Sequence, residues 1–158
     1  MSKVAVNDYG NISERYGGFW VRVAASIIDG IIITVPMSVL FIIYSFITAP
    51  EEGTATDEEL VTMLLGYTVI YIIALIGIAL YYILTTASKM QGTVGKKIMG
   101  LKVVDLNGNR LTFGRATGRY FATILSGMIF NIGYLMAAFT EKKQTLHDMI
   151  ASTLVVKK

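Results

Sequence analysis

The sequence contains no cysteine and only one histidine, and both shortages exclude chemistry. Without cysteine there is no disulfide and no thiolate ligand, and a single histidine leaves zinc with too few of its usual ligands. No Ser-His pair and no carboxylates paired closely in sequence indicate hydrolysis. We therefore expect no enzyme activity, no cofactor, no metal centre and no nucleic-acid partner.

Charged residues are scarce as well. They make up 16% of the chain, whereas 54% of its residues are hydrophobic and the mean hydropathy is +0.59. Soluble domains rarely have so apolar a composition. We expect residues 1–158 to form one small all-α domain that is integral to the lipid bilayer.

Two long apolar runs predict membrane-spanning helices at residues 21–47 and 60–87. The first run is about 40 Å long as a helix, enough to cross a hydrocarbon layer of about 30 Å with some tilt. The linker between them, residues 48–59, ends in the capping-box pattern Thr56-Asp57-Glu58-Glu59, which predicts the start of the second helix. Because the first run is too long for a signal peptide, we expect it to stay in the mature protein as an anchor.

Lysine and arginine are absent from the linker 48–59, which carries five acidic residues instead. Cytoplasmic loops of membrane proteins carry an excess of basic residues. The linker is therefore predicted to lie outside the cytoplasm, and the N-terminal segment 1–20 inside it. The loop 88–118, with six basic residues and the single acid Asp105, is predicted to be cytoplasmic.

Within this basic loop, the run GTVGKKIMG lacks the glycine that a phosphate loop needs, because Met90 stands at that place. We expect a short interfacial helix here, with Lys96 and Lys97 near anionic lipid headgroups. The following run, LKVVDLNGNRLTF, alternates and contains Asn107-Gly108, which predicts a short cytoplasmic β-hairpin. Residues 152–156, STLVV, have similar β character and would add a strand to it if the tail is cytoplasmic.

A third apolar segment, residues 119–140, allows two topologies. If it spans the bilayer once, the basic tail 141–158 lies outside, against the charge rule. If it turns back as a broken or re-entrant helix, all basic segments lie inside. We favour the second topology because Gly127, Asn131 and Gly133 near the middle supply turn material, and irregular backbone at membrane depth is tolerated where protein lines it.

Asp29 lies eight residues into the first apolar run, and Arg22 lies seven residues before it. An ionised residue at the centre of a membrane helix costs roughly 2.5 to 3.5 kcal/mol, so such residues usually pair inside the protein and mark a pathway or relay. The two share one helix face about 10 Å apart, which is too far for direct pairing. Arg22 is either an interfacial anchor or functional. Asp29 is either functional or structural, as a carboxyl group that stays neutral or is hydrogen-bonded between helices, for example through Ser26.

Three ordered motifs resemble the RDD family of bacterial membrane proteins. They are the run YGGFWVR at 16–22 followed by Ile28-Asp29, the run GTVGKKIMGLKVVD at 92–105, and the run QTLHDMIAST at 144–153. The resemblance covers nearly the whole chain and implies that the helices lie in the inner (cytoplasmic) cell membrane of a bacterium. It assigns Arg22, Asp29 and Asp148 to the arginine and two aspartates that give the family its name. It also implies a transport role, since some members are linked to exchange of monovalent cations for protons.

These residues suggest one functional hypothesis and one alternative. Asp148, beside His147, would pair with Arg22 and close a cavity whose floor is Asp29, with Ser26 and Asn131 as supporting polar groups; Asp29 would then bind a proton or a monovalent cation. Reversing both charges of the Arg22–Asp148 pair should restore what either reversal destroys. Alternatively, so small a chain works as a homodimer or as an accessory subunit of another membrane protein.

Overall fold

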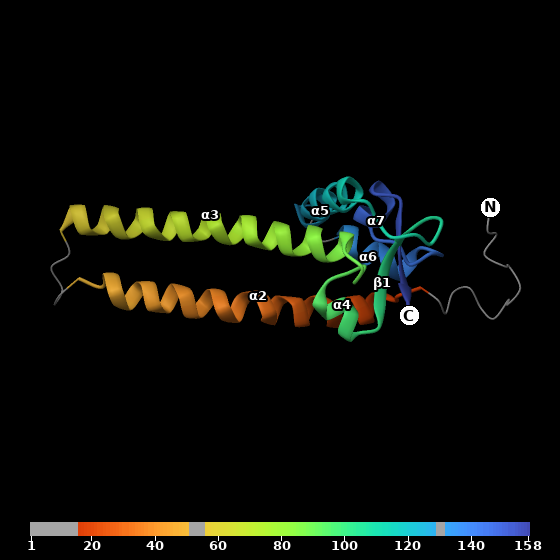
Figure 1. Cartoon of the computed structure of the whole chain (residues 1–158), viewed down its shortest axis with the longest axis horizontal. Coiled ribbons are helices and arrows are strands. Elements are labelled where there is room, and N and C mark those ends of the chain that lie inside the picture. Colours follow the sequence, from red (N-terminus) through yellow and green to blue (C-terminus); the bar gives the residue numbers. More distant parts are fainter. Residues whose placement is uncertain (1–15, 51–55, 129–131) are drawn as a thin grey trace, which may run out of the picture.

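The two predicted membrane helices are present in the computed structural model, which describes residues 16–50, 56–128 and 132–158. Helix α2 spans Phe19–Thr48 and helix α3 spans Asp57–Ala87. Both are long and apolar enough to cross a membrane, and they run side by side along the molecule (Figure 1). Helix α2 begins two residues earlier than predicted, at Phe19, and α3 begins three residues earlier, because Asp57, Glu58 and Glu59 form its first turn.

The first turn of α3 forms as its sequence predicts. The Thr56 hydroxyl accepts a hydrogen bond from the Glu59 backbone N–H at 3.3 Å, and the Thr56 N–H donates to the Glu59 carboxylate at 2.9 Å. Three acids, Asp57, Glu58 and Glu59, stand in this turn and face the positive end of the helix dipole. This end of α3 is therefore fixed by local contacts alone.

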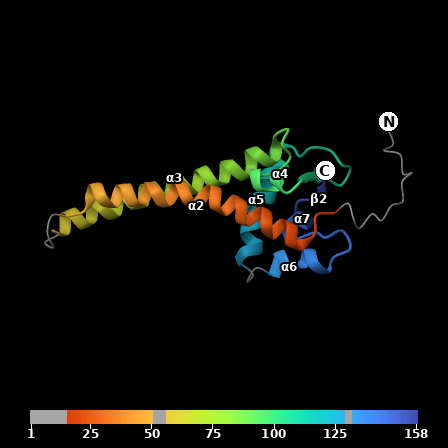
Figure 2. The same ribbon diagram turned by 90° about the horizontal axis from the view of Figure 1, so that it is seen from below.

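The remaining elements gather at the opposite end of the two long helices (Figures 1 and 2). In chain order they are α4 (Val94–Ile98), β1 (Leu101–Asp105), α5 (Phe113–Met128), α6 (Ile132–Phe139), α7 (Leu146–Ile150) and β2 (Thr153–Lys157). The C-terminus lies at this end too. We call this assembly, together with the ends of α2 and α3 that it contacts, the charged end. The other halves of α2 and α3, which it leaves uncovered, are the outer hairpin.

Strands β1 and β2 pair antiparallel, with Leu101 opposite Lys157 and Asp105 opposite Thr153. The added strand from the tail is thus confirmed. Just before α2, the Gly17 N–H donates to the Val155 carbonyl at 2.9 Å, so the start of α2 is joined to β2 as well. Since β1 follows α3 and β2 ends the chain, this pairing brings the loop 88–118 and the tail to the same side.

The predicted β-hairpin around Asn107-Gly108 is wrong, although its turn exists. Gly108 has φ +83° and donates to the Asp105 carbonyl at 3.0 Å, and the Asp105 side chain accepts from the Asn109 N–H at 2.8 Å. After this turn the chain does not return along β1. Leu111 is buried in the core and α5 begins two residues later, while the open edge of β1 is taken by β2.

The third apolar segment is bent, as the broken-helix topology predicts. The axes of α5 and α6 differ by 95°, and the two figures together show α5 lying across α3 rather than along it. A straight third span is not what the described residues form. Asn131, predicted to lie in the turn, falls outside the described residues.

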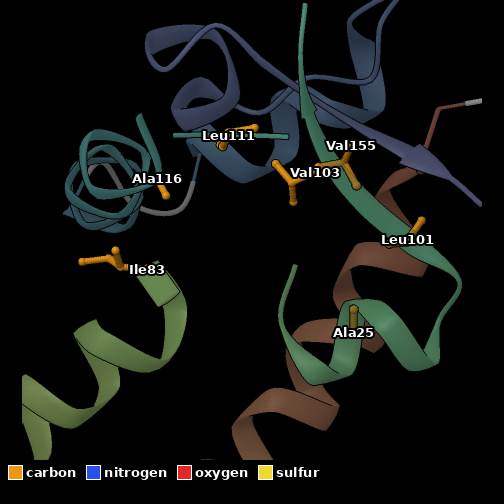
Figure 3. Close-up of a cluster of buried hydrophobic side chains, with 7 residues drawn as sticks. All are labelled: Ala25, Ile83, Leu101, Val103, Leu111, Ala116 and Val155. Atoms are coloured by element: carbon orange, nitrogen blue, oxygen red, sulfur yellow. The ribbon is translucent and has the colours of Figure 1, made fainter. Parts of the chain in front are cut away.

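The hydrophobic core lies within the charged end. It consists of seven buried side chains drawn in Figure 3: Ala25, Ile83, Leu101, Val103, Leu111, Ala116 and Val155. Ile83 of α3 faces Ala116 of α5, and Val103 of β1 lies near Leu111 and Val155 (Figure 3). Ala25 of α2 lies against α4. This core fixes the ends of both long helices relative to the small elements that carry the polar residues.

Candidate functional site

Asp29 is buried where α2, α3 and the start of α4 meet. Its side chain, 1% exposed, accepts three hydrogen bonds. Two come from the Tyr81 hydroxyl at 2.8 Å and the Gly95 N–H at 2.8 Å, and the third comes from the Thr93 hydroxyl. A buried carboxylate is costly unless donors satisfy it, and here α3 supplies one donor and the start of α4 supplies two.

The sequence around α4 explains this close approach. Thr93 is the N-cap of α4, and the Val94 N–H donates to the Tyr81 hydroxyl at 3.1 Å. A Cβ on Gly95 would lie 2.1 Å from the Ala25 carbonyl oxygen and 2.9 Å from Asp29 Oδ1. Only glycine therefore lets α4 pack against α2 at this distance, and Asp29 fastens α4 to both long helices.

Asp148 forms the second buried cluster of charge. It is paired with Arg22 of α2 and Arg119 of α5, and it accepts from the Thr145 N–H at 3.2 Å as part of a capping box at the start of α7. Burial raises the pKa of the Asp148 carboxyl, but Arg119 and Arg22 together hold it well below its usual range. One carboxylate thus joins α2, α5 and α7.

Arg22 points into the protein rather than to the membrane surface. Besides its pair with Asp148, its Nε donates to the Gly17 carbonyl at 2.8 Å and its Nη2 to the Lys143 carbonyl at 2.6 Å. The predicted pairing of Arg22 with Asp148 is present. Arg119 is an additional partner, so a double charge reversal would set a new arginine at position 148 against Arg119 and is not expected to restore the cluster.

A cavity of about 570 Å³ opens between α2, α3, α5 and α6. Basic, hydroxyl-bearing and apolar side chains line it; they are Phe19, Arg22, Val23, Ser26, Ile27, Tyr82, Thr86, Lys96, Ala116, Arg119, Tyr120, Thr123, Tyr134, Leu135, Thr145 and His147. Asp29, expected to form its floor, does not line it: that carboxylate faces Tyr81, Thr93 and Gly95 instead. The two buried aspartates therefore belong to different surroundings.

The cavity also holds two of the predicted supporting residues. Ser26 lines it and donates to the Arg22 carbonyl at 2.9 Å rather than to Asp29. His147 contacts the Thr145 hydroxyl through Nε2 at 2.9 Å, while burial and, after it, Arg119 lower its pKa to about 3. At neutral pH His147 is therefore uncharged, and it contributes no charge to the cavity.

The two lysines predicted at the headgroups differ in position. Lys97 is exposed on α4, whereas Lys96 is partly buried and lines the cavity. Burial, followed by the nearby Arg119, lowers the pKa of Lys96 to about 7. Within ranges 16–50, 56–128 and 132–158, no group of three or more histidine or acidic side chains could hold a metal ion.

Sequence reasoning missed three residues of these clusters: Arg119, Tyr81 and Thr93. Arg119 had a readable signal, because it is an ionised residue at the edge of an apolar segment, the same kind of signal that singled out Asp29. Thr93 had a weaker one as the N-cap before a short helix. Tyr81 had none, because a neutral hydroxyl that contacts Asp29 cannot be recognised from charge or hydropathy.

Comparison with known proteins identifies relatives along nearly the whole chain. A family described as the RDD family matches residues 16–152. The uncharacterized protein YxaI of Bacillus subtilis is 51% identical over 92% of this chain and 99% of its own length. The uncharacterized membrane protein YteJ of the same organism is 30% identical over 92% of this chain and 83% of its own.

No solved structure matches this chain. The family match includes all three residues that carry the resemblance, Arg22, Asp29 and Asp148, and the structure places each of them in a buried polar cluster. The two long apolar helices are consistent with a relative described as a membrane protein. The chain belongs to the RDD family and is a multi-pass membrane protein.

Proposed function

We propose that this protein exchanges a monovalent cation for a proton across the cell membrane, with Asp29 as the group that binds either ion. The observation that carries the proposal is the surroundings of Asp29: a fully buried carboxylate whose side-chain partners are both hydroxyls, Tyr81 and Thr93. A hydroxyl can donate to an ionised carboxylate and accept from a protonated one. The same oxygens are the ligands that alkali and other hard cations prefer.

The surroundings also supply oxygen beyond the hydroxyls. The Ala25 carbonyl and Asp29 Oδ1 both lie beside Gly95, at 2.1 and 2.9 Å from the place its Cβ would occupy. When the Thr93 and Tyr81 hydroxyls rotate their hydrogens away, their two oxygens and the carboxylate itself could coordinate a cation at Asp29. Proton and cation would thus compete for one carboxylate, which is the requirement for exchange.

The orientation of the protein follows from the charge distribution. No lysine or arginine stands between Arg22 and Lys89, and this interval contains the five acids of the linker. By the positive-inside rule the charged end is cytoplasmic, and with it the N-terminal segment and the tail. Asp29 would then receive ions from the cytoplasmic side.

A transport path needs more than one copy of this chain. Beyond Asp29 the outer hairpin consists of α2 and α3 alone, and its large side chains are exposed, for example Phe46 at 79% and Leu65 at 62%. Two helices do not enclose a path through a bilayer. We therefore expect exchange to require a homo-oligomer that packs the outer hairpins together.

The test is proton movement in liposomes that contain the purified protein, driven in turn by gradients of Na⁺, Li⁺ and K⁺. Wild type should move protons with at least one of these cations, Asp29→Asn should not, and Asp29→Glu should retain partial flux. Tyr81→Phe keeps the carboxylate and should change the cation preference or the apparent affinity. Folding of each variant is checked by its elution profile and melting temperature.

No flux in wild type with any cation, or wild-type flux in a folded Asp29→Asn variant, would contradict the proposal. The first result would favour an accessory role, in which the uncovered outer hairpin binds another membrane protein. Stoichiometric co-purification of a partner from native membranes would then be the deciding observation.

A further inference from the structure

The cavity beside α4 has an uneven charge that the cation-exchange proposal does not use. Three cationic side chains line it, Arg22, Lys96 and Arg119, and no acidic side chain among the described residues does so. Arg22 and Arg119 share the single carboxylate of Asp148, and the Asp29 carboxylate faces Tyr81, Thr93 and Gly95 instead of the cavity. The cavity lining therefore has more basic groups than the acids paired with them.

Lys96 is the one of these three basic side chains that has no acidic partner among the described residues. Arg22 and Arg119 are both paired with Asp148, whereas no hydrogen bond or ion pair joins the Lys96 ammonium to any residue in the described part of the chain. Arg119 uses Nε and Nη2 for Asp148, and its Nη1 makes no hydrogen bond within the described ranges. A lysine ammonium and one edge of a guanidinium therefore present N–H donors to the cavity.

The neutral part of the lining fits a ligand with two different ends. Three tyrosines, Tyr82, Tyr120 and Tyr134, and the hydroxyls of Thr86 and Thr123 supply polar groups. Phe19, Val23, Ile27 and Leu135 supply an apolar wall, and Ile27 is 58% exposed on the outer surface of α2. Tyrosines that combine an apolar ring with a polar tip are typical of the level where lipid headgroups meet the hydrocarbon.

We propose that this cavity binds the phosphate group of an anionic phospholipid, with Lys96 and Arg119 contacting the phosphate and the acyl chains leaving along Val23 and Ile27. A phosphate monoanion would supply the negative charge that the cluster lacks. Lysine and arginine are the side chains that bind phosphate best, through charge-assisted hydrogen bonds. A free phosphate ion shares this chemistry, but it would leave the apolar wall without a partner.

The state of Lys96 makes the binding dependent on pH. Burial and the neighbouring Arg119 and Arg22 disfavour its charged form, whereas Asp148 and Asp29 favour it, and the balance lowers its pKa to about 7. Among the described groups, His147 faces it from α7 and is uncharged at neutral pH. A bound phosphodiester would favour the protonated amine, so lipid should bind more tightly at pH 6 than at pH 8.

The experiment measures phospholipid retention by the purified full-length chain. Protein in nanodiscs of phosphatidylcholine containing a minor fraction of phosphatidylglycerol is extracted gently, and the retained lipids are identified by native mass spectrometry. Wild type should retain phosphatidylglycerol over phosphatidylcholine, more strongly at pH 6 than at pH 8. Lys96→Gln should lower the preference about tenfold, the effect of losing one charge-assisted hydrogen bond.

Two variants separate the cavity from general surface charge. Lys89→Gln removes the same charge from an exposed position of the same loop that does not line the cavity, and it should keep the wild-type preference within about twofold. Lys96→Arg should restore the preference but remove its pH dependence, because arginine stays protonated over this range. Lipid preference and its pH dependence are both measured without ion flux. They therefore test the lipid site separately from the role of Asp29 in exchange.

Inorganic phosphate, added to protein in phosphatidylcholine alone, distinguishes the source of the anion. Stabilisation by phosphate that needs Lys96, without selective retention of phosphatidylglycerol, would overturn the lipid assignment in favour of a soluble anion. Equal retention of both lipids by wild type, or equal losses in Lys96→Gln and Lys89→Gln, would overturn the site itself.

Discussion

The charged end and the outer hairpin are held together in different ways. In the charged end, a small core is surrounded by buried ion pairs and hydrogen bonds that join residues more than 100 positions apart, such as Arg22 and Asp148. In the outer hairpin the contacts between the described side chains are local and include no ion pair: the Tyr67 ring packs against Phe41 and Tyr44, Tyr67 shares a hydrogen bond with the Ser45 hydroxyl, and Tyr44 donates to the Met63 carbonyl at 3.3 Å. The outer hairpin therefore depends on the bilayer for its surroundings, whereas the charged end is held together by its own polar residues.

The largest effect is expected at Asp148. The substitution Asp148→Asn leaves two guanidiniums, Arg22 and Arg119, without a counter-charge in a buried site, and breaking such a pair costs about 3–5 kcal/mol. The variant should aggregate on extraction or melt far below wild type in a detergent thermal-shift assay.

A matched control uses the exposed pair of Arg115 and Asp105 at 3.5 Å. Because water screens this pair, Arg115→Gln should change stability by less than about 1 kcal/mol. If the two variants melt alike, the cluster around Asp148 does not hold the charged end together.

A smaller but clear loss of stability is expected for Gly95→Ala. Its methyl group would lie 2.1 Å from the Ala25 carbonyl oxygen, so α4 must move away from α2, at a cost of about 1–3 kcal/mol. Gly118→Ala is the control, because nothing lies within 4 Å of a Cβ there and alanine favours the helix by about 0.5–1 kcal/mol. Opposite shifts in melting temperature are expected, and a tolerated Gly95→Ala would show that α4 is not tightly docked.

Acid should weaken the charged end through His147. Burial lowers its pKa to about 3. Between pH 6.5 and pH 3 the imidazole is therefore protonated in the unfolded chain but not in the folded one. Stability should therefore fall as the pH drops through this window. In His147→Gln the melting temperature should fall less steeply than in wild type between pH 7 and pH 5. If it falls as steeply, other groups cause the pH dependence.

The smallest effect is expected in the outer hairpin. A Cβ on Gly66 would lie 1.7 Å from the Tyr44 hydroxyl, but that atom ends a flexible side chain and can rotate away. Gly66→Ala should lose only the Tyr44–Met63 hydrogen bond, about 1 kcal/mol, and Gly77→Ala, with open space around it, should not be destabilised, because alanine favours the helix there as it does at Gly118. A loss as large as that of Gly95→Ala would mean that the outer hairpin carries its own specific packing.

Local signals predicted the parts of the fold that depend on local physics. Apolar length predicted α2 and α3, and the Thr56–Glu59 capping box predicted where α3 begins. The Asn107-Gly108 turn formed as well, but the strand expected after it did not, because the tail took the edge of β1. A turn signal fixes four residues, whereas the choice of a strand's partner is decided by the whole assembly.

The part of the site that was predictable from sequence is the pairing of buried charges, because a buried charge is stable only with a partner. The need for a counter-charge predicted that Arg22 pairs with Asp148. It did not indicate how many basic residues share that carboxylate, so Arg119 was missed. For Asp29 the sequence predicted burial. It did not predict the hydrogen bonds from Tyr81, Thr93 and Gly95, because neutral donors cannot be recognised from the hydropathy or charge of the sequence. The separation of Asp29 from the cavity follows from the same unseen contacts.

The most direct test of the central claim is infrared difference spectroscopy of the carboxyl band as Na⁺, Li⁺ or K⁺ is added to membranes containing the protein. If Asp29 exchanges a proton for a cation, the effective cation should remove a protonated-carboxyl band in wild type, and Asp29→Asn should lack that change. An identical difference spectrum in folded Asp29→Asn, or no carboxyl change in wild type with any cation, would contradict the claim.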